Sequence, residues 1–484
     1  MNKNCKNLPS PLLSAIPIII LVALLVVTIR TFGSDALTGG SQIVLLTSTA
    51  VTSMLAMLFC KVKWDTIEHA ICQNILGVST ALIILLLIGA LSGSWMVSGI
   101  VPTMIYYGMQ IIHPNFFLAT SCIICAVVSI MTGSSWTTIA TIGVALMGIG
   151  EAQGFPTGWV AGAIISGAYF GDKVYPLSDT TVLASSVTGT PLFTHIRYMT
   201  YTTVPSLIVT LTLFVCMGFG HTSADSSQIA AYANSLNDTF YITPWLMVVP
   251  IVTAILIGKK VPSLITLFVS SVMAGICAIL FQPGLLLQIA GTDVAGGIAL
   301  FKGTFLSYYG STSIDTGNAS LNDLVATRGM SGMLDTIWLI ICAMCFGGAM
   351  QASGMLESLT SLFVRFMKRG VGMVSSTVCS GLFLNLVTAD QYISIILTGN
   401  MFKEVYKKNG YDSCLLSRTT EDAVTVTSVL IPWNSCGMTQ STILGVATLT
   451  YLPYCFFNLL SPFMSILVMA LGFKIRKLKQ EVAG

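Results

Sequence analysis

Long apolar runs dominate this chain of 484 residues and limit what it can fold into. The runs Leu12–Ile29, Ile43–Cys60, Ile75–Leu91, Trp245–Ile257 and Ser263–Phe281 approach or reach the ~20 residues that a bilayer-spanning helix needs. Charged residues make up only 8% of the chain, whereas a soluble domain carries about 25%. We therefore predict an all-α polytopic membrane protein with about 11–13 hydrophobic segments, some of them half-length or re-entrant.

Basic residues cluster beside the apolar runs. Lys3 and Lys6 precede the first run, which resembles a signal peptide but is longer and lacks a small-residue cleavage site. The other clusters are Lys61/Lys63, Lys259/Lys260, Arg365/Lys368/Arg369, Lys403/Lys407/Lys408 and Lys474–Lys479. Because cytoplasmic loops are enriched in Lys and Arg, they predict a multi-pass protein of the cytoplasmic (inner) membrane with both termini in the cytoplasm. This charge distribution is a topology signal and does not indicate a nucleic-acid partner.

Several features recur at a spacing of 256 residues. Thr132 corresponds to Thr388, Gly154 to Gly410 and Pro176 to Pro432. The charge bias reverses between the halves, because residues 403–408 contain three lysines and the matching residues 147–152 contain none. This reversal is typical of two inverted structural repeats with broken helices and re-entrant hairpins. The alternative is chance similarity between two Gly-rich apolar stretches.

The repeat divides the chain into five regions. They are an N-terminal helix and loop (1–42), a first inverted repeat (43–220), an external linker with connecting scaffold helices (221–289), a second inverted repeat (290–474) and a basic cytoplasmic tail (475–484).

Polar residues interrupt the apolar runs at two places in the first half. Ser134 and Ser135 follow Gly133 and predict the tip of a hairpin. Pro176 removes a backbone donor and predicts an unwound helix beside Asp172, Ser178, Asp179, Thr180 and Thr181. The structural alternatives are a surface loop, an ion pair between Asp172 and Lys173, and an N-cap role for Asp179.

The second half repeats this arrangement with different side chains. Asp390 lies at the matching hairpin, and the later polar residues are Asp422, Thr425, Thr427, Asn434 and Ser435. Glu421 is close enough in sequence to pair with Arg418, which would be a structural role. Asp422 has no close basic neighbour in sequence, and a buried carboxylate without a partner is easier to protonate than one in water. Such a group can exchange a proton for a cation.

The remaining composition argues against other classes. The 13 cysteines occur mostly singly in apolar runs, and the four histidines have no metal-binding spacing. A nucleophile–base arrangement is not evident, so we predict a protein that is not an enzyme and needs no cofactor. No repeated filter motif suggests a channel.

Six blocks resemble the NhaC-type Na⁺/H⁺ antiporter family, within the broader ion-transporter superfamily. They are GAYFGDKVYPLSDTT (167–181), GTPLFTHIR (189–197), YTTVP (201–205), TADQY (388–392), LSRTTED (416–422) and IPWNSCG (431–437). The chain departs from the family pattern at Val174, Tyr175, Val182, Val424 and Val429. The resemblance implies secondary active transport on a two-lobed fold, often dimeric, and some relatives carry malate and lactate or amino acids. We therefore expect a homodimer in lipid, with Na⁺ and H⁺ as transported ions.

The predicted function is exchange of Na⁺ for H⁺ through intramembrane carboxylates. We assign Na⁺ to Asp179 and Asp422, with neutral oxygens from Ser178, Thr180, Thr181, Thr425, Thr427, Asn434 and Ser435. Ser134, Ser135 and Asp390 would line the same cavity, and Asp172 is a second-line candidate. The alternative is a Na⁺- or H⁺-coupled carrier of a small organic anion or amino acid on the same fold, with helix N-termini holding a carboxylate.

Overall fold

The computed structural model describes residues 8–32, 39–176, 178–220, 226–291, 296–317, 322, 325–365 and 370–478. Over these residues the chain is helical, with two isolated β-bridges, Thr312–Thr327 and Tyr411–Lys477. Lys3, Lys6, Lys368, Arg369 and residues 479–484 of the predicted tail lie outside the described residues.

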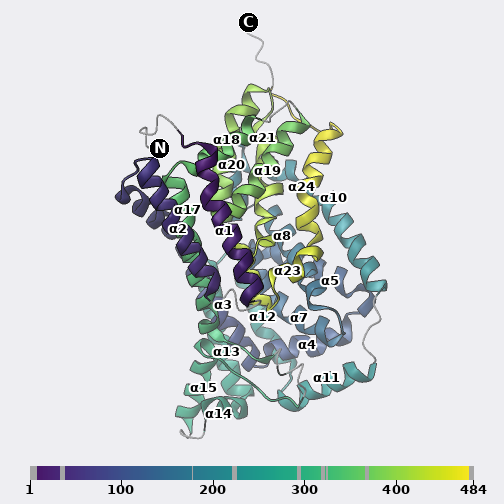
Figure 1. The fold of residues 1–484 in the computed structure, drawn as a ribbon. Coiled ribbons are helices and arrows are strands. Elements are labelled where there is room, and N and C mark those ends of the chain that lie inside the picture. The colour runs from purple at the N-terminus through teal and green to yellow at the C-terminus, as the bar shows by residue number, and fades with distance from the viewer. Residues whose placement is uncertain are drawn as a thin grey trace.

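The helices of the first half follow one another with short connections (Figure 1). They are α1 (Pro11–Phe32), α2 (Gly40–Phe59), α3 (Trp64–Val97), α4 (Ile100–Ile111), η2 (Pro114–Phe116), α5 (Phe117–Thr132), α6 (Ser135–Thr138), the π-helix η3 (Ile139–Gly143), α7 (Val144–Ala152), α8 (Thr157–Val174), α9 (Asp179–Thr188) and α10 (Leu192–Phe219).

A middle group leads to the second half. The middle group is α11 (Ser226–Thr239), η4 (Pro244–Met247), α12 (Val248–Gly258), α13 (Ser263–Phe281), α14 (Pro283–Ala290) and α15 (Gly297–Tyr309). The second half continues with η5 (Gly329–Met333), α17 (Leu334–Ala352), α18 (Met355–Arg365), α19 (Val371–Thr388), α20 (Gln391–Lys408), α21 (Ser413–Thr420), the π-helix η6 (Glu421–Thr425), η7 (Ser428–Leu430), α22 (Ser435–Leu444), α23 (Thr448–Tyr451), η8 (Leu452–Tyr454) and α24 (Phe456–Ala470).

Eight of the described helices are long and apolar enough to cross a membrane. They are α1, α2, α3, η2 with α5, α10, α13, η5 with α17, and α19. Two bent pairs, Ala230–Thr239 with Pro244–Gly258 at 87° and Thr448–Tyr454 with Phe456–Ala470 at 54°, bring the number to ten if each is one span. Half-length helices such as α9 and α22 make up further segments. The prediction of a polytopic all-α membrane protein is confirmed.

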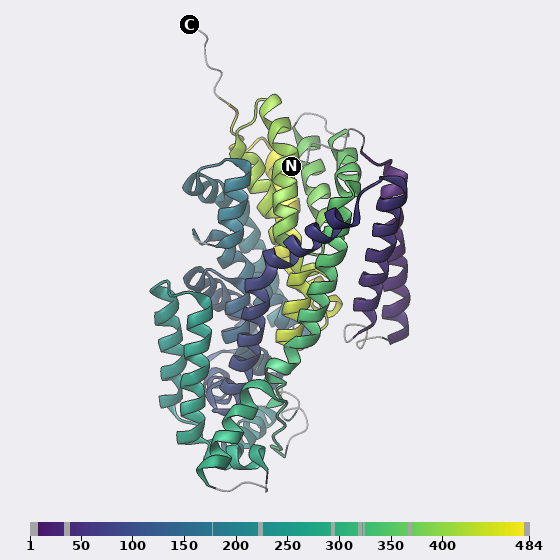
Figure 2. The ribbon, with the colours of Figure 1, turned by 90° about the vertical axis from the view of Figure 1, so that its left-hand side faces the viewer.

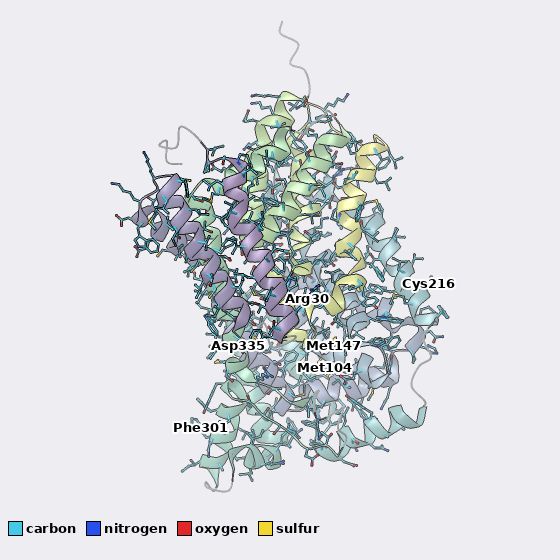
Figure 3. The ribbon with its side chains drawn as sticks, viewed as in Figure 1. Arg30, Met104, Met147, Cys216, Phe301 and Asp335 are labelled. Atoms are coloured by element: carbon cyan, nitrogen blue, oxygen red, sulfur yellow. The ribbon has the colours of Figure 1, made fainter. Side chains whose placement is uncertain are left out.

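Apolar side chains cover the outward faces of these helices. Phe301 on α15 and Cys216 on α10 are exposed and lie at opposite edges of the molecule (Figure 3). On α13, the exposed residues Ile265, Phe268 and Val272 follow a helical spacing. Large exposed apolar residues on a chain of this hydropathy are explained by contact with lipid.

The helix ends of the two halves recur at the predicted spacing. α9 spans Asp179–Thr188 and α22 spans Ser435–Leu444, so both their ends differ by 256 residues. The same spacing separates the start of α8 from that of α21, and the end of α5 from that of α19. The left-handed residues that end these helices also match, with φ of 75° at Gly189 and 67° at Gly445. The chain therefore uses one local fold twice, while the inverted orientation of the copies stays a prediction.

Both helix breaks occur where the prolines predict them. α8 ends at Val174 and α9 begins at Asp179, on either side of Pro176. In the second half, η7 ends at Leu430 and α22 begins at Ser435, on either side of Pro432. The chain leaves the helix because proline lacks the donor that an uninterrupted helix would need.

Glycines bring α8 close to α5 just before its break. A Cβ at Gly167 would lie 2.0 Å from the Cys122 carbonyl oxygen, and one at Gly171 would lie 2.5 Å from that of Ala126. Small residues allow membrane helices to approach in this way. The close packing fixes the end of α8, which carries Asp172 and Lys173, against the helix that leads to the first hairpin.

The beginning of α1 and the end of α24 lie at the same end of the molecule (Figure 1). At that end Tyr411 forms its β-bridge with Lys477. α13, α14 and α15 form the opposite end, as the teal helices in Figures 1 and 2 show. This arrangement fits an even number of crossings.

Candidate functional site

Each half contains a sharp turn between two helices, formed in the same way. Gly133 follows α5 with φ of 67°, and Ala389 follows α19 with φ of 55°. The next residues, Ser134 and Asp390, cap the following helix with their side chains, through the backbone N–H groups of Thr137 and Ile393 respectively. Left-handed backbone followed by an N-cap reverses the chain within a few residues.

In the first half this turn meets the broken helix around Asp172. Ser135 donates its backbone N–H (3.1 Å) and its hydroxyl (2.7 Å) to Asp172 Oδ2. Ser178 donates its hydroxyl to Asp172 Oδ1 at 2.6 Å and lies 3.1 Å from the Thr180 hydroxyl. All four residues are buried. We call Ser135, Asp172, Ser178 and Thr180 the first cradle.

The second half has a corresponding group around Asp390. Ser435 donates its hydroxyl to Asp390 Oδ2 at 3.2 Å, while the Ile393 N–H binds Oδ1 at 3.0 Å. Ser428 donates to Gln391 Oε1 at 3.3 Å, and these two residues match Asp172 and Ser135 at the 256-residue spacing. We call Asp390, Gln391, Ser428 and Ser435 the second cradle. The carboxylate thus sits on the broken helix in one half and on the hairpin in the other.

Side chains between the two cradles connect them. The Cys436 thiol interacts with Trp136 and Tyr169 of the first half and with Ser428 of the second cradle. Tyr392, directly after Gln391, interacts electrostatically with Asp172, Asp179 and Asp390. The two cradles therefore belong to one polar region built from both halves.

A charged cluster lies beside the cradles. Lys173 Nζ forms a buried ion pair with Asp422 Oδ1, and the Ser461 hydroxyl lies 3.3 Å from Lys173 Nζ and 3.4 Å from Asp422 Oδ1. Arg418 Nε lies 4.0 Å from Asp422 Oδ2, and its guanidinium lies 4.8 Å from the centre of the Tyr198 ring. The pair links α8 of the first half to η6 of the second.

Most of the predicted site residues fall into three groups. Ser135, Asp172, Ser178 and Thr180 meet in the first cradle, Asp390 and Ser435 meet in the second, and Ser134 and Asn434 act as N-caps, as the bonds to the Thr137 and Cys436 N–H groups show. Thr181 binds the Lys173 carbonyl at 3.2 Å, and Thr427 accepts from Asn385 at 3.1 Å. Among the described residues, the Thr425 hydroxyl makes no hydrogen bond.

The two acids to which the sequence assigned Na⁺ lie in different environments. Asp179 is exposed in the first turn of α9. Asp422 is buried and paired with Lys173, so the expectation of an unpaired acid at this position is wrong. Lys173 does not pair with its neighbour Asp172 either, because the Asp172 carboxylate is taken by Ser135 and Ser178.

Sequence reasoning left out four residues of this region. Gln391 and Ser428 belong to the second cradle, and the 256-residue spacing would have identified them as partners. Lys173 and Arg418 are the basic residues of the two polar blocks, and a buried cation needs an anion nearby. That requirement predicts an anion beside Lys173 but does not say which one, and the structure places Asp422 there, 249 residues away.

The chemistry of this region is that of hard oxygen ligands. Carboxylate, hydroxyl and amide oxygens suit hard cations, whereas imidazole and thiolate suit transition metals. In the described part of the chain, no group of three or more His, Cys, Asp or Glu side chains could hold a metal ion. Buried carboxylates on broken helices in a polytopic membrane protein define a transporter of ions or polar solutes.

Comparison with known proteins identifies the family. The sequence pattern of the Na⁺/H⁺ antiporter family matches residues 6–183 and 167–473. The chain is 36% identical over 426 residues to the Na⁺/H⁺ antiporter NhaC of Alkalihalophilus pseudofirmus, covering 88% of this chain and 89% of that protein. The chain therefore belongs to the Na⁺/H⁺ antiporter family.

Two other relatives carry organic substrates, according to their names. The malate-2H⁺/Na⁺-lactate antiporter of Bacillus subtilis is 36% identical over 394 residues, 81% of each chain. The arginine/ornithine antiporter ArcD of Halobacterium salinarum is 33% identical over 462 residues, 95% of this chain and 90% of that protein. Both relatives are transporters according to their names.

Proposed function

We propose that the chain is a secondary active transporter that exchanges Na⁺ for H⁺ across the cytoplasmic membrane. One observation carries the proposal: each half holds a buried carboxylate, Asp172 or Asp390, among hydroxyls at the meeting point of a hairpin and a broken helix. Acids at such positions are costly in a membrane unless they bind ions or protons.

The two cradles supply the ligands of the transported cation. In the first, Na⁺ is bound by the Asp172 carboxylate and by the hydroxyl oxygens of Ser135, Ser178 and Thr180. The Ser135 and Ser178 hydroxyls donate to Asp172 here, and the Thr180 hydroxyl lies 3.1 Å from that of Ser178; all three turn their lone pairs toward the ion when it binds. In the second, Asp390 and Ser435 act with the Gln391 amide oxygen. Asp422 keeps its partner Lys173, and the exposed Asp179 lies outside the ligand set.

The transport cycle follows from competition. A buried carboxylate is stable when it is protonated or when a cation neutralises it, and unstable when it is charged and alone. If only the neutralised forms can cross the membrane, each Na⁺ moved one way requires protons to move the other way. The cycle rests on burial and needs no cofactor.

The alternative is a carrier of a small organic anion or amino acid. Tyr175 supports it, because its ring contacts the first hairpin at Gly133 and it departs from the family pattern there. An organic substrate would also explain why two relatives with organic substrates align over most of the chain. We also propose a homodimer with both termini in the cytoplasm.

Proteoliposomes test the function directly. A Na⁺ gradient imposed on vesicles with the wild-type protein should drive H⁺ movement, followed by an internal pH dye. Asp172→Asn and Asp390→Asn should each reduce the initial rate by about 100-fold, in line with the loss of a ligand and its charge at a metal site. Asp238→Asn, at an exposed position of α11, is the matched control and should leave the rate unchanged.

The same assay separates the alternatives. Added malate, lactate, arginine or ornithine should not accelerate H⁺ movement if Na⁺ is the substrate. Strict dependence on one of these solutes would favour the organic carrier. Wild-type H⁺ movement in both Asn variants would remove the cradles from the mechanism.

A further inference from the structure

Glu421 is a buried acid that the cradles do not use. It is the first residue of the π-helix η6, directly before Asp422, and it is fully buried. Neither of its carboxylate oxygens has a hydrogen-bond partner among the described residues. The Thr425 hydroxyl on the next turn is close enough to interact with this carboxylate, although not in the geometry of a normal hydrogen bond. A charged carboxylate in this position would be costly, so the arrangement suits a protonated Glu421.

Charged groups surround Glu421 from two halves of the chain. Lys173 and Asp172 act on it electrostatically from α8, and Asp422 acts from its own helix. Arg418 lies three residues earlier, with all three guanidinium nitrogens lacking hydrogen bonds within the described structure. The helices α9, α19, α20 and α24 also pack against η6.

The side chains that these other helices bring to η6 are neutral in the described structure. They are Ala184 on α9, Gly381 and Asn385 on α19, Ile395 on α20, and Ser461 on α24. On α10, which packs against α21, His195 binds the Ser417 hydroxyl at 2.8 Å. The charged groups that act on Glu421 are therefore Lys173, Asp172 and Asp422, with Arg418 three residues earlier in the chain.

The charges around Glu421 leave its carboxyl group balanced between the protonated and the ionised state. Lys173 and Asp422 neutralise each other. Arg418 and Asp172 also carry opposite charges, so a protonated Glu421 leaves these five groups without net charge, and an ionised one leaves them with a net negative charge. Burial favours the protonated acid, whereas the two cations favour the carboxylate. A further change of one nearby charge can shift this balance.

Asp172 supplies that change. Its negative charge opposes ionisation of Glu421 as long as the first cradle is empty. A Na⁺ ion bound to Asp172 cancels the charge and removes the opposition. We infer that Glu421 binds the exchanged proton, and that Na⁺ entering the first cradle expels it. The inference rests on the proposed function, but it separates the proton site from the cation site.

Linkage makes this inference measurable. If Na⁺ expels a proton, then protons must weaken Na⁺ binding by the same factor, which is about 5–150-fold for coupled sites. Glu421→Gln resembles the protonated acid at every pH. The Na⁺ affinity of this variant should vary little with pH. It should equal the wild-type affinity at low pH and lie below the wild-type affinity at high pH.

The experiment adds NaCl to weakly buffered, purified protein with a pH dye and measures ²²Na⁺ binding in parallel from pH 6 to 9. The wild type should release protons when NaCl is added and should release none when choline chloride is added. Glu421→Gln should bind ²²Na⁺ without releasing protons. Glu421→Asp, which keeps an acid, should restore the release at a shifted pH. Glu404→Gln, at an exposed position of α20, should behave as the wild type.

The outcomes distinguish the two proposals. No Na⁺-induced release from the wild type would overturn Na⁺/H⁺ exchange and the role of Glu421 with it. Release from the wild type that persists in Glu421→Gln would overturn the role of Glu421 alone. If Glu421→Gln does not fold, Glu421→Asp provides the test. Proton release by Glu421→Asp with the same pH dependence as the wild type would overturn the role of Glu421.

Discussion

At the scale of single residues, Lys173 shows how the chain tolerates charge inside a membrane. Its ammonium group is fully buried, with Asp422 and Ser461 beside it and the Phe457 ring at 5.8 Å. Taking two charges out of water is expensive, so such a pair adds little net stability, but removing one partner leaves the other alone. The pair therefore acts as a link between α8 and η6.

Removal of one partner should cost more than removal of both. We expect Lys173→Met or Asp422→Asn to lower the free energy of unfolding by about 3–5 kcal/mol, because each leaves an uncompensated charge. The double variant should lose less free energy of unfolding than either single variant, because it leaves neither charge of the pair without its partner. Unfolding in mixed micelles measures all three, with Lys403→Met at an exposed position as the control. Additive losses would mean that the two residues do not act as a pair.

At the scale of elements, the hairpin turns differ between the halves in one informative way. Both place a residue in the left-handed region, but the first uses Gly133 and the second uses Ala389. A Cβ at Gly133 would lie 2.2 Å from Tyr175 Cε1. The first turn therefore requires glycine for its backbone and for its packing, whereas the second carries the strain of a side chain in that region.

This difference predicts opposite effects of exchanging the two residue types. Gly133→Ala should lower the free energy of unfolding by about 1 kcal/mol or more, because alanine is unfavourable at positive φ and would strike the Tyr175 ring. Ala389→Gly relieves a left-handed penalty of about 1–2 kcal/mol, and the greater freedom of glycine in the unfolded chain partly offsets this gain. Unfolding in mixed micelles measures both, with Gly258→Ala, in open space, as the control. Equal losses in the two variants would contradict the explanation.

At the scale of the whole molecule, local patterns in the sequence predicted most of the helices and turns, whereas contacts between residues far apart in sequence could not be predicted. The apolar runs, the prolines and the 256-residue spacing predicted the helical class, both helix breaks and both hairpin turns, because each depends on residues near one another in sequence. The partner of Lys173 was not predictable in this way. Asp172 is adjacent to it and Asp422 is 249 residues away, yet packing of the two halves selects Asp422. Spacing likewise gave no sign that Asp179 would face outward while Asp172 faces Ser135 and Ser178.

The sequence repeat also predicts that the two halves have opposite orientations in the membrane, and cysteine labelling can test this prediction. If the copies are inverted, matching loops lie on opposite sides of the membrane, and the lysine-rich one should be cytoplasmic. The matching loops join α7 to α8 and α20 to α21. Thr157→Cys and Lys408→Cys report on them, because both positions are exposed. In a background without native cysteines, a membrane-impermeant maleimide applied to whole cells should label Thr157→Cys and should reach Lys408→Cys only after permeabilisation. Labelling of both from the same side would contradict the inverted repeat.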